Sequence, residues 1–246
     1  MSLLSKFPGL RILMRNIEYI KRPAPLEEFA DYDAYWQART ADGRIARELD
    51  RFKVIANLID ESASVLDIGC GDCAFQQYLS RVKPTCKSLG VDISADAVRL
   101  AKEQGYDAQV LEPTDRLQSQ IAGTWDVVTL MEIIEHVADA EDLMRQVLEL
   151  KPSRIFVTIP NVGCLKHRLR LMFGSRFPIT AVYYHMKEHI RFWTTKDFLQ
   201  WSDSLGLTVE SVHGQFDHGD RIVEWAVKKY PSVFADRVIY ELRPQV

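Results

Sequence analysis

The chain has 246 residues, 47% of them hydrophobic and 26% charged, and its 31 basic residues against 34 acidic ones leave a net charge of −3. This composition excludes intrinsic disorder as the main state, suffices for one large domain with additions, and argues against a globally basic nucleic-acid-binding protein. No run approaches the ~20 apolar residues of a membrane-spanning helix, and the 4 cysteines predict reduced cytoplasmic thiols instead of a disulfide scaffold.

Residues 1–44 are predicted to form a helical leader or lid. Their first part is basic and lacks the small-residue cleavage site of a secretory signal peptide. It suits a helix packed on the domain or on a partner better than one docked on an acidic membrane surface. The leader then carries an aromatic cluster, formed by Tyr32, Tyr35 and Trp36 together with the nearby Arg39. Closure over a bound ligand, core packing and contact between the copies of a homodimer each explain this cluster.

From residue 45 the pattern becomes regular and predicts one domain over residues 45–246. Apolar residues spaced by three and four between Ile45 and Ile59 predict a helix. Short apolar runs then alternate with helical segments, which is typical of a doubly wound, Rossmann-like α/β fold with a mostly parallel sheet covered on both faces. The predicted strands are residues 64–68, 88–93, 108–111, 126–131 and 154–159, and the helices are about 73–82, 95–104, 115–122 and 138–151.

Residues 161–193 interrupt this alternation and are rich in His, Arg and aromatic side chains, which predicts an α-rich insertion over the strand ends. Thr194 and Asp197 then fit a capping box that opens a further helix. Two last strands make seven in total, and their helix-poor return predicts an antiparallel last strand. These final elements are strands at 207–212 and 237–242, a helix at 223–229 and a break at Pro231.

The most informative segment is a glycine loop, VLDIGCGDCA at residues 65–74, placed between the first strand and its helix. Glycines there let the backbone turn sharply and approach a ligand. Asp92 ends the second strand, where an acidic side chain accepts hydrogen bonds from both hydroxyls of a ribose. Together the loop and the acid indicate an adenosine-containing ligand.

Two adenosine cofactors compete for this loop, because Gly69-x-Gly71-x-x-Ala74 also satisfies the dinucleotide fingerprint. Asp67 lies two residues before the first glycine, where its charge would repel a pyrophosphate and attract an ammonium and a sulfonium group. Charge therefore favours S-adenosylmethionine, with an NAD-dependent oxidoreductase as the competing interpretation. Cys70-x-x-Cys73 has metal or redox spacing, but no second pair lies nearby and no metal site is predicted.

Three segments resemble the successive motifs of class I S-adenosylmethionine-dependent methyltransferases: VLDIGCG at 65–71, GVDI at 90–93, and WDVV through IEHV at 125–137. The resemblance covers about residues 45–212. It implies that the loop lies along the methionine part of the cofactor, that the acid after the second strand holds the ribose, and that the end of the third strand flanks the adenine. The implied cofactor-binding residues are Asp67, Gly69, Cys70, Gly71, Asp92, Ile93, Leu111, Glu112, Met131 and Glu132.

Two details qualify this resemblance. Cys73 stands where many members carry a third glycine, which affects how tightly the loop can turn. The segments IPNVG at 159–163, RLRL at 168–171 and FPIT at 177–180 are similar to MetW-like proteins of methionine biosynthesis. This similarity leaves open a cofactor-binding partner subunit that transfers no methyl group itself.

Methyl transfer to a hydroxyl benefits from a base, and histidine suits that role at neutral pH. The candidate catalytic residues are His136, which follows Glu135 beyond the fourth strand, and His189, which precedes the capped helix. A structural role for His136, hydrogen-bonded to backbone at a helix start, is equally open. Glu135 and the aromatic cluster of the leader are candidate contacts of the acceptor.

The insertion carries six basic side chains and one acidic one, which favours an acceptor bearing phosphate or carboxylate, although a solvated helix face explains the charge equally well. Arg168 and Arg191 are the candidates to bind it. The sequence thus predicts a cytoplasmic methyltransferase that uses S-adenosyl-L-methionine, releases S-adenosyl-L-homocysteine, and O-methylates a small-molecule or glycan-type acceptor.

Overall fold

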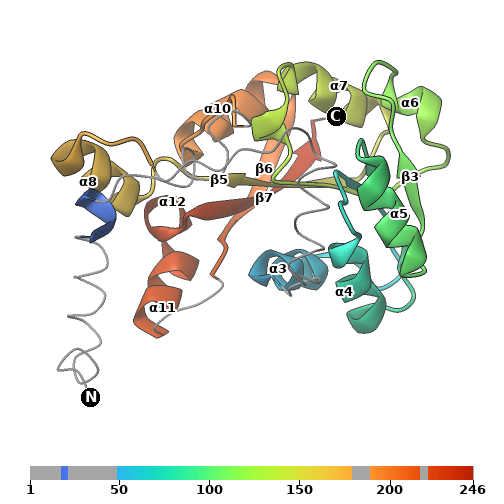
Figure 1. Cartoon of the computed structure of the whole chain (residues 1–246), viewed down its shortest axis with the longest axis horizontal. Helices are drawn as coiled ribbons and strands as arrows, with labels where there is room; N and C mark the ends of the chain where they lie inside the picture. Colours follow the sequence, from blue (N-terminus) through green and yellow to red (C-terminus); the bar gives the residue numbers. More distant parts are fainter. Residues whose placement is uncertain (1–17, 22–48, 179–188, 217–220, 246) are drawn as a thin grey trace.

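The computed structural model describes residues 18–21, 49–178, 189–216 and 221–245. Its apolar runs form one seven-stranded sheet in the order β3-β2-β1-β4-β5-β7-β6 (Figure 1). The strands are β1 Ser64–Ile68, β2 Lys87–Asp92, β3 Ala108–Val110, β4 Val127–Met131, β5 Arg154–Pro160, β6 Leu207–Gly214 and β7 Arg237–Pro244. The helices are α3 Asp50–Leu58, α4 Ala74–Val82, α5 Ala95–Glu103, α6 Leu117–Gln120, η2 Ile134–His136, α7 Ala140–Glu149, α8 Leu165–Gly174, α10 Thr195–Ser204, α11 Arg221–Lys229 and α12 Pro231–Phe234.

The sheet confirms the predicted doubly wound α/β fold. Neighbouring strands among β1 to β5 pair in parallel, as the connecting helices require, whereas β7 pairs antiparallel with both β5 and β6. The last strand therefore lies inside the sheet, and β6 forms its edge. Since β7 is paired on both sides, its middle residues Ile239 and Tyr240 are fully buried.

Helices cover both faces of the sheet (Figure 1). On one face, Met144 of α7 and Phe198 of α10 belong to the larger core cluster, and Phe198 stacks on Tyr240 with ring centroids 3.9 Å apart. On the other face, Ile55 of α3 and Phe75 of α4 pack in a second cluster. β1 and β4, which contribute residues to both clusters, are thereby held between two apolar layers, which makes them a rigid support.

The capping box predicted before α10 is present in full. The Thr194 side chain accepts from the backbone N–H of Asp197, and the Asp197 carboxylate accepts from the Thr194 N–H. This reciprocal bonding satisfies two otherwise orphaned donors and starts the helix one residue after Thr194. Pro231, predicted as a break, instead begins the short helix α12, a position that suits its missing N–H.

The predicted insertion contains the helix α8. A helical turn at residues 18–21 lies beside α8 (Figure 1), where the Arg170 guanidinium donates to the Tyr19 carbonyl. The remainder of the predicted leader, including its aromatic cluster Tyr32, Tyr35, Trp36 and Arg39, lies outside the described residues. Among the described helices, none has the length and apolar character needed to cross a membrane.

Candidate functional site

The strand order reverses between β1 and β4, so a crevice is expected at the carboxyl ends of these strands. The glycine loop follows β1, Asp92 ends β2, and Glu132 follows β4. The predicted cofactor residues and the predicted catalytic residues therefore meet at one edge of the sheet.

The glycine loop owes its shape to left-handed backbone conformations. Gly69 has φ +73° and Gly71 has φ +55°, which glycine adopts without a Cβ clash. A Cβ on Gly69 would also lie 2.0 Å from Cδ1 of Ile133, so the loop packs directly on the segment after β4. Cys73, with φ +61°, occupies a conformation that glycine adopts more easily, which fits the third glycine that the resemblance implies at this position.

Asp92 is joined to the glycine loop by hydrogen bonds. Its Oδ2 accepts from the Gly71 N–H at 2.8 Å and its Oδ1 accepts from the Ser94 N–H at 2.9 Å. The neighbouring Ile93 is 49% exposed, an apolar surface beside a polar one. Leu111 N donates to the Asp92 carbonyl at 2.8 Å, which brings the end of β3 to the same place. The Leu111 side chain is buried, whereas Glu112 is exposed.

Asp67 is buried beneath the loop and accepts from Thr129 Oγ1 at 2.5 Å. Burial raises the pKa of Asp67 to about 7 against the effect of that hydrogen bond, and the nearby charge of Asp92 raises it further. The carboxyl is therefore poorly stabilised as an anion by its own surroundings. A cationic group bound next to it would relieve this cost, which fits the ammonium of S-adenosylmethionine.

Glu132 follows β4 with φ +61°, a strained conformation for a residue other than glycine. Its carboxylate accepts from Arg237 Nε at 2.7 Å and from Thr158 Oγ1 at 3.1 Å, and Arg51 lies 4.0 Å away. Burial by itself would raise the pKa of Glu132, but the charges of Arg237 and Arg51 hold it below its usual range. Glu132 thus stays ionised next to the half-buried Met131.

Glu135 lies in the opposite electrostatic environment. Its side chain is 1% exposed, and neither carboxylate oxygen has a hydrogen-bond partner among the described residues. Burial and the charge of Glu132 raise the pKa of Glu135 well above its usual value. A carboxyl group in this environment is stabilised either by a bound proton or by a nearby cation.

The two candidate catalytic histidines adjoin Glu135. His136 and His189 meet edge to face with ring centroids 4.5 Å apart, and His189 Nε2 lies 3.9 Å from Glu135 Oε1. The Glu135 carbonyl accepts from Ile190 N at 2.9 Å, which anchors the segment carrying His189. One ligand atom from each of the three side chains lies within 4.8 Å of the other two, so the group could also hold a divalent cation.

The candidate acceptor-binding arginines have partners inside the protein. Arg191 donates to Glu141 at 2.6 Å and to the Ala138 carbonyl, and Arg168 donates to the Gly163 carbonyl. Lys166 pairs with Asp236. The basic charge of the insertion is therefore largely used to hold the fold together, which removes the main argument for an anionic acceptor.

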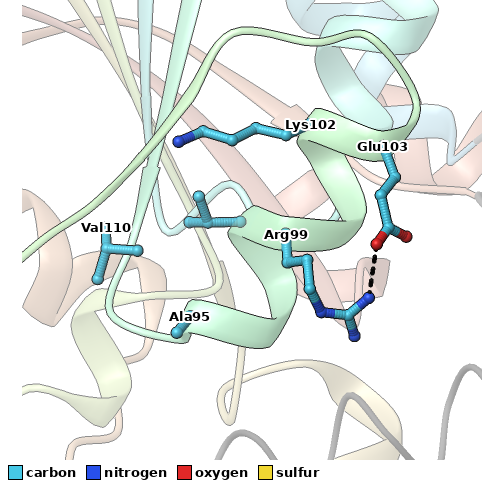
Figure 2. Close-up of a pocket in the computed structure, with 6 residues that line it drawn as sticks. Ala95, Arg99, Lys102, Glu103 and Val110 are labelled. Carbon is cyan, nitrogen blue, oxygen red and sulfur yellow. Dashed lines mark hydrogen bonds and ion pairs between the residues drawn. The ribbon is translucent and has the colours of Figure 1, made fainter.

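A shallow hollow of about 460 Å³ lies between α5 and β3, and two of its lining residues, Ala95 and Val110, come close in the chain to Ile93 and Leu111. Figure 2 shows Ala95, Val110 and the other residues that line it, among them Arg99 and Glu103, whose charged groups are 2.8 Å apart. Among the described residues, no predicted site residue lines it. Its lining offers no cluster of convergent polar groups, so it is not the candidate site.

Sequence reasoning missed the residues that support Glu132. Arg237 comes from β7, 105 residues later in the chain, and Arg51 comes from α3. Only the pairing of β7 beside β5 brings Arg237 to the end of β4. No local pattern in the sequence signals such a partner.

Comparisons with known proteins agree with the fold of this chain. A family model described as a methyltransferase domain matches residues 35–212. A ubiquinone biosynthesis O-methyltransferase of Aeromonas salmonicida is 28% identical over 61% of this chain, and the match spans 65% of that relative. A ubiquinone biosynthesis O-methyltransferase of Cupriavidus pinatubonensis is 24% identical over 78% of this chain and 80% of its own length.

Two solved structures share the fold. A TehB-like SAM-dependent methyltransferase of Corynebacterium glutamicum superimposes with a TM-score of 0.55 at 16% identity, over 87% of this chain and 96% of its own. The plantazolicin methyltransferase BamL, solved with SAH, gives a TM-score of 0.59 at 16% identity over 94% and 95% of the two chains.

Proposed function

This chain belongs to the methyltransferase-domain family, and on that premise we propose that it transfers a methyl group from S-adenosylmethionine to a hydroxyl oxygen of a small acceptor. The observation that carries the proposal is the arrangement of residues at one edge of the sheet. There the glycine loop is bonded to Asp92 and packs through Gly69 on Ile133, two residues before Glu135 of the cluster Glu135, His136 and His189. The names of the O-methyltransferase relatives support oxygen as the accepting atom.

The cofactor half of the site would use Asp67, Asp92 and the glycine loop. S-adenosylmethionine, when bound, supplies a methyl group activated by its sulfonium. The Asp92 carboxylate, already held in place by two backbone N–H groups, would accept from the ribose hydroxyls. Asp67 would neutralise the ammonium, Ile93 would lie on the adenine, and Met131 would border the reacting carbon.

The acceptor half would use the cluster of Glu135, His136 and His189. Transfer forms an oxygen–carbon bond and breaks the sulfur–carbon bond, and the hydroxyl proton must leave. An imidazole of the cluster would take that proton directly, or the three side chains would hold a divalent cation that lowers the pKa of the hydroxyl, so that its proton passes to solvent. Glu132, kept ionised by Arg237, would support the positive charge that develops at this cluster.

Uncharged hydroxyl acceptors suit this site better than sugar phosphates. The arginines that would bind a phosphate, Arg168 and Arg191, already donate to internal partners. The exposed apolar side chains Ile190 and Phe192 lie beside His189 in the chain. An apolar rim at a proton-accepting cluster favours a phenol over a charged sugar.

The test measures transfer from labelled S-adenosylmethionine to a panel of phenols, sugars and sugar phosphates, with and without a chelator. We expect labelled product with a phenol. Asp92→Ala should weaken cofactor binding at least about 10-fold, since it removes charge-assisted hydrogen bonds. Glu135→Gln should lower turnover and leave cofactor binding intact, whereas the surface control Glu149→Gln should change neither.

Chelation separates the two routes for the proton. Loss of turnover that added Mg²⁺ or Mn²⁺ restores indicates the cation, and unchanged turnover indicates an imidazole base. His213→Gln, on β6, serves as the histidine control. Cofactor binding without transfer to any acceptor, together with stable copurification of a second enzyme, would contradict the proposal and favour the partner-subunit interpretation. Stabilisation by NAD in place of S-adenosylhomocysteine would contradict it as well.

A further inference from the structure

A second cluster of metal-ligating side chains lies at the junction of α8 and β7. Cys164, His167 and Asp236 each offer one ligand atom within 4.8 Å of the other two. The Cys164 thiol donates to Asp236 Oδ1 at 3.3 Å, and His167 Nε2 lies 3.8 Å from the same oxygen. Cys164 and His167 are both 1% exposed, whereas the Asp236 side chain is 35% exposed. The cluster is therefore buried on two sides and open to solvent on the third.

Local structure explains why these three residues meet. Cys164 is the N-cap of α8, and His167 follows three residues later on the same side of the first turn. Asp236 immediately precedes β7, and its carbonyl accepts from Asn161 N at 2.7 Å. This bond joins the start of β7 to the turn that leads from β5 into α8. The backbone thus fixes the relative positions of the three ligands.

The surroundings orient two of the ligands toward each other. His167 Nδ1 forms a 2.5 Å hydrogen bond with the Tyr19 hydroxyl, and the other ring nitrogen, Nε2, lies toward Asp236 Oδ1. Lys166 pairs with Asp236 Oδ2, which turns Oδ1 toward the cluster. Hydrogen bonds that fix the far nitrogen of a histidine and the far oxygen of a carboxylate are typical of zinc sites.

We propose that Cys164, His167 and Asp236 bind a zinc ion, separate from the methyl-transfer site. Tetrahedral bonds of about 2.0–2.3 Å would place sulfur and oxygen ligands about 3.5 Å apart and nitrogen and oxygen ligands about 3.3 Å apart. The 3.3 and 3.8 Å separations in this structure need only small adjustments to match these values. Zinc displaces the thiol proton, which passes to solvent, and a water completes the fourth position.

A zinc ion here would link three parts of the fold. It would join the insertion helix α8 to β7, and through the Tyr19 hydrogen bond it would steady the helical turn at 18–21. Since Arg237, the next residue after Asp236, holds Glu132, the same ion would stiffen a support of the methyl-transfer site. The role inferred for zinc is structural.

The experiment replaces zinc with Co²⁺ in the full-length, metal-free, reduced protein. A thiolate bound to Co²⁺ gives a charge-transfer absorption band in the near ultraviolet, which a site of carboxylates and imidazoles does not. We expect the band to saturate at one equivalent, to vanish in Cys164→Ser and to persist in the matched control Cys86→Ser. Tyr19→Phe should weaken zinc binding about 10-fold, as loss of an outer hydrogen bond does.

X-ray absorption on the zinc-loaded wild-type protein tests the proposal without any variant. We expect a sulfur neighbour at about 2.3 Å from zinc together with nitrogen and oxygen neighbours. A spectrum with nitrogen and oxygen neighbours only would overturn the proposal. A cobalt band that survives in folded Cys164→Ser would also overturn it and would assign the metal to Cys70 and Cys73.

Discussion

Three residues of the candidate site adopt states that their residue type alone disfavours. Cys73 and Glu132 have left-handed backbone conformations, and Asp67 is a buried carboxyl with a pKa of about 7. Such states persist only where the surrounding structure holds them, and they gather at functional sites. In this chain all three lie at the carboxyl ends of β1 and β4, where the cofactor and the acceptor are proposed to meet.

The pKa of Asp67 predicts a pH dependence of stability. Its folded pKa of about 7 exceeds the ordinary 3.8, so the protonated group stabilises the fold below pH 4 and this contribution is lost as the pH rises through 7. Between pH 4 and 7 the unfolding free energy of the wild-type protein should fall by up to about 4 kcal/mol because of this group, and in Asp67→Asn this part of the fall should be absent. Urea unfolding at several pH values measures this, and an unaltered pH profile in the variant would contradict it.

The same carboxyl predicts how cofactor affinity varies with pH. A cationic ligand binds the ionised form of Asp67, whose population grows as the pH rises from 6 to 8. Affinity for S-adenosylmethionine in the wild-type protein should therefore increase over this interval, and in Asp67→Asn it should be weaker and flat. Calorimetric titration at three pH values distinguishes the two proteins.

Gly69 predicts a coupling between the cofactor loop and the acceptor cluster. In Gly69→Ala the new Cβ would force Ile133 to move, and Ile133 adjoins Glu132. We expect loss of both cofactor binding and turnover, with partial recovery on adding Ile133→Ala. Gly105→Ala is the control, because Gly105 also has positive φ but open space around its Cβ. It should cost about 1 kcal/mol of stability and leave binding unchanged.

At the scale of elements, α7 positions the segment that carries His189. Glu141 in its first turn accepts from Arg191 at 2.6 Å and from Trp201 Nε1 at 2.7 Å. The hydrogen bond from Arg191 lowers the pKa of Glu141 to about 2, so the interaction persists throughout the working pH range. The first turn of α7 thereby holds both the segment that precedes α10 and α10 itself.

Loss of this tie predicts a selective catalytic defect. Glu141→Ala should lower kcat several-fold by loosening His189, with cofactor affinity unchanged within about twofold and a stability loss of about 1 kcal/mol. The control Glu149→Ala, at the other end of α7, removes only an exposed pair with Arg116. Equal kcat values for the two variants would show that Arg191 does not position His189.

The elements themselves were largely predictable from the sequence. β1 matches its predicted bounds, and β2 to β5 differ by a residue or two, because continuous apolar runs between helices leave little choice. The internal hydrogen bonds of Arg168 and Arg191 were not predictable, since the sequence does not distinguish a basic side chain that binds a ligand from one that binds a backbone carbonyl or a carboxylate of the protein. Glu132 was placed in the site by resemblance, but its strain and its partner Arg237 depend on tertiary packing.

At the scale of the whole molecule, the strand β7 holds a residue of the candidate site in place. Arg237 begins β7 and bonds to Glu132 at the end of β4. Removing Arg237 should raise the pKa of Glu132, since burial then outweighs the remaining charge of Arg51. The site thus depends on a strand that contributes no predicted cofactor contact.

Arg237→Gln predicts a shift in the pH profile of turnover. If ionised Glu132 supports transfer, the acid limb of kcat should move to higher pH, while turnover above pH 8 should approach that of the wild-type protein. Arg243→Gln, an exposed position on the same strand, is the control. An unmoved acid limb in Arg237→Gln would exclude this role for Glu132.

The place of β7 between β5 and β6 has a consequence for synthesis on the ribosome. β6 leaves the exit tunnel before β7, although β6 pairs with β7. One edge of β5 also stays unpaired until β7 is available. Until β7 emerges, the nascent chain carries an unpaired apolar strand edge, which is prone to aggregation. Chaperone demand during translation should therefore peak while β7 is still missing, and truncation within β7 should leave both β5 and β6 without their partner strand.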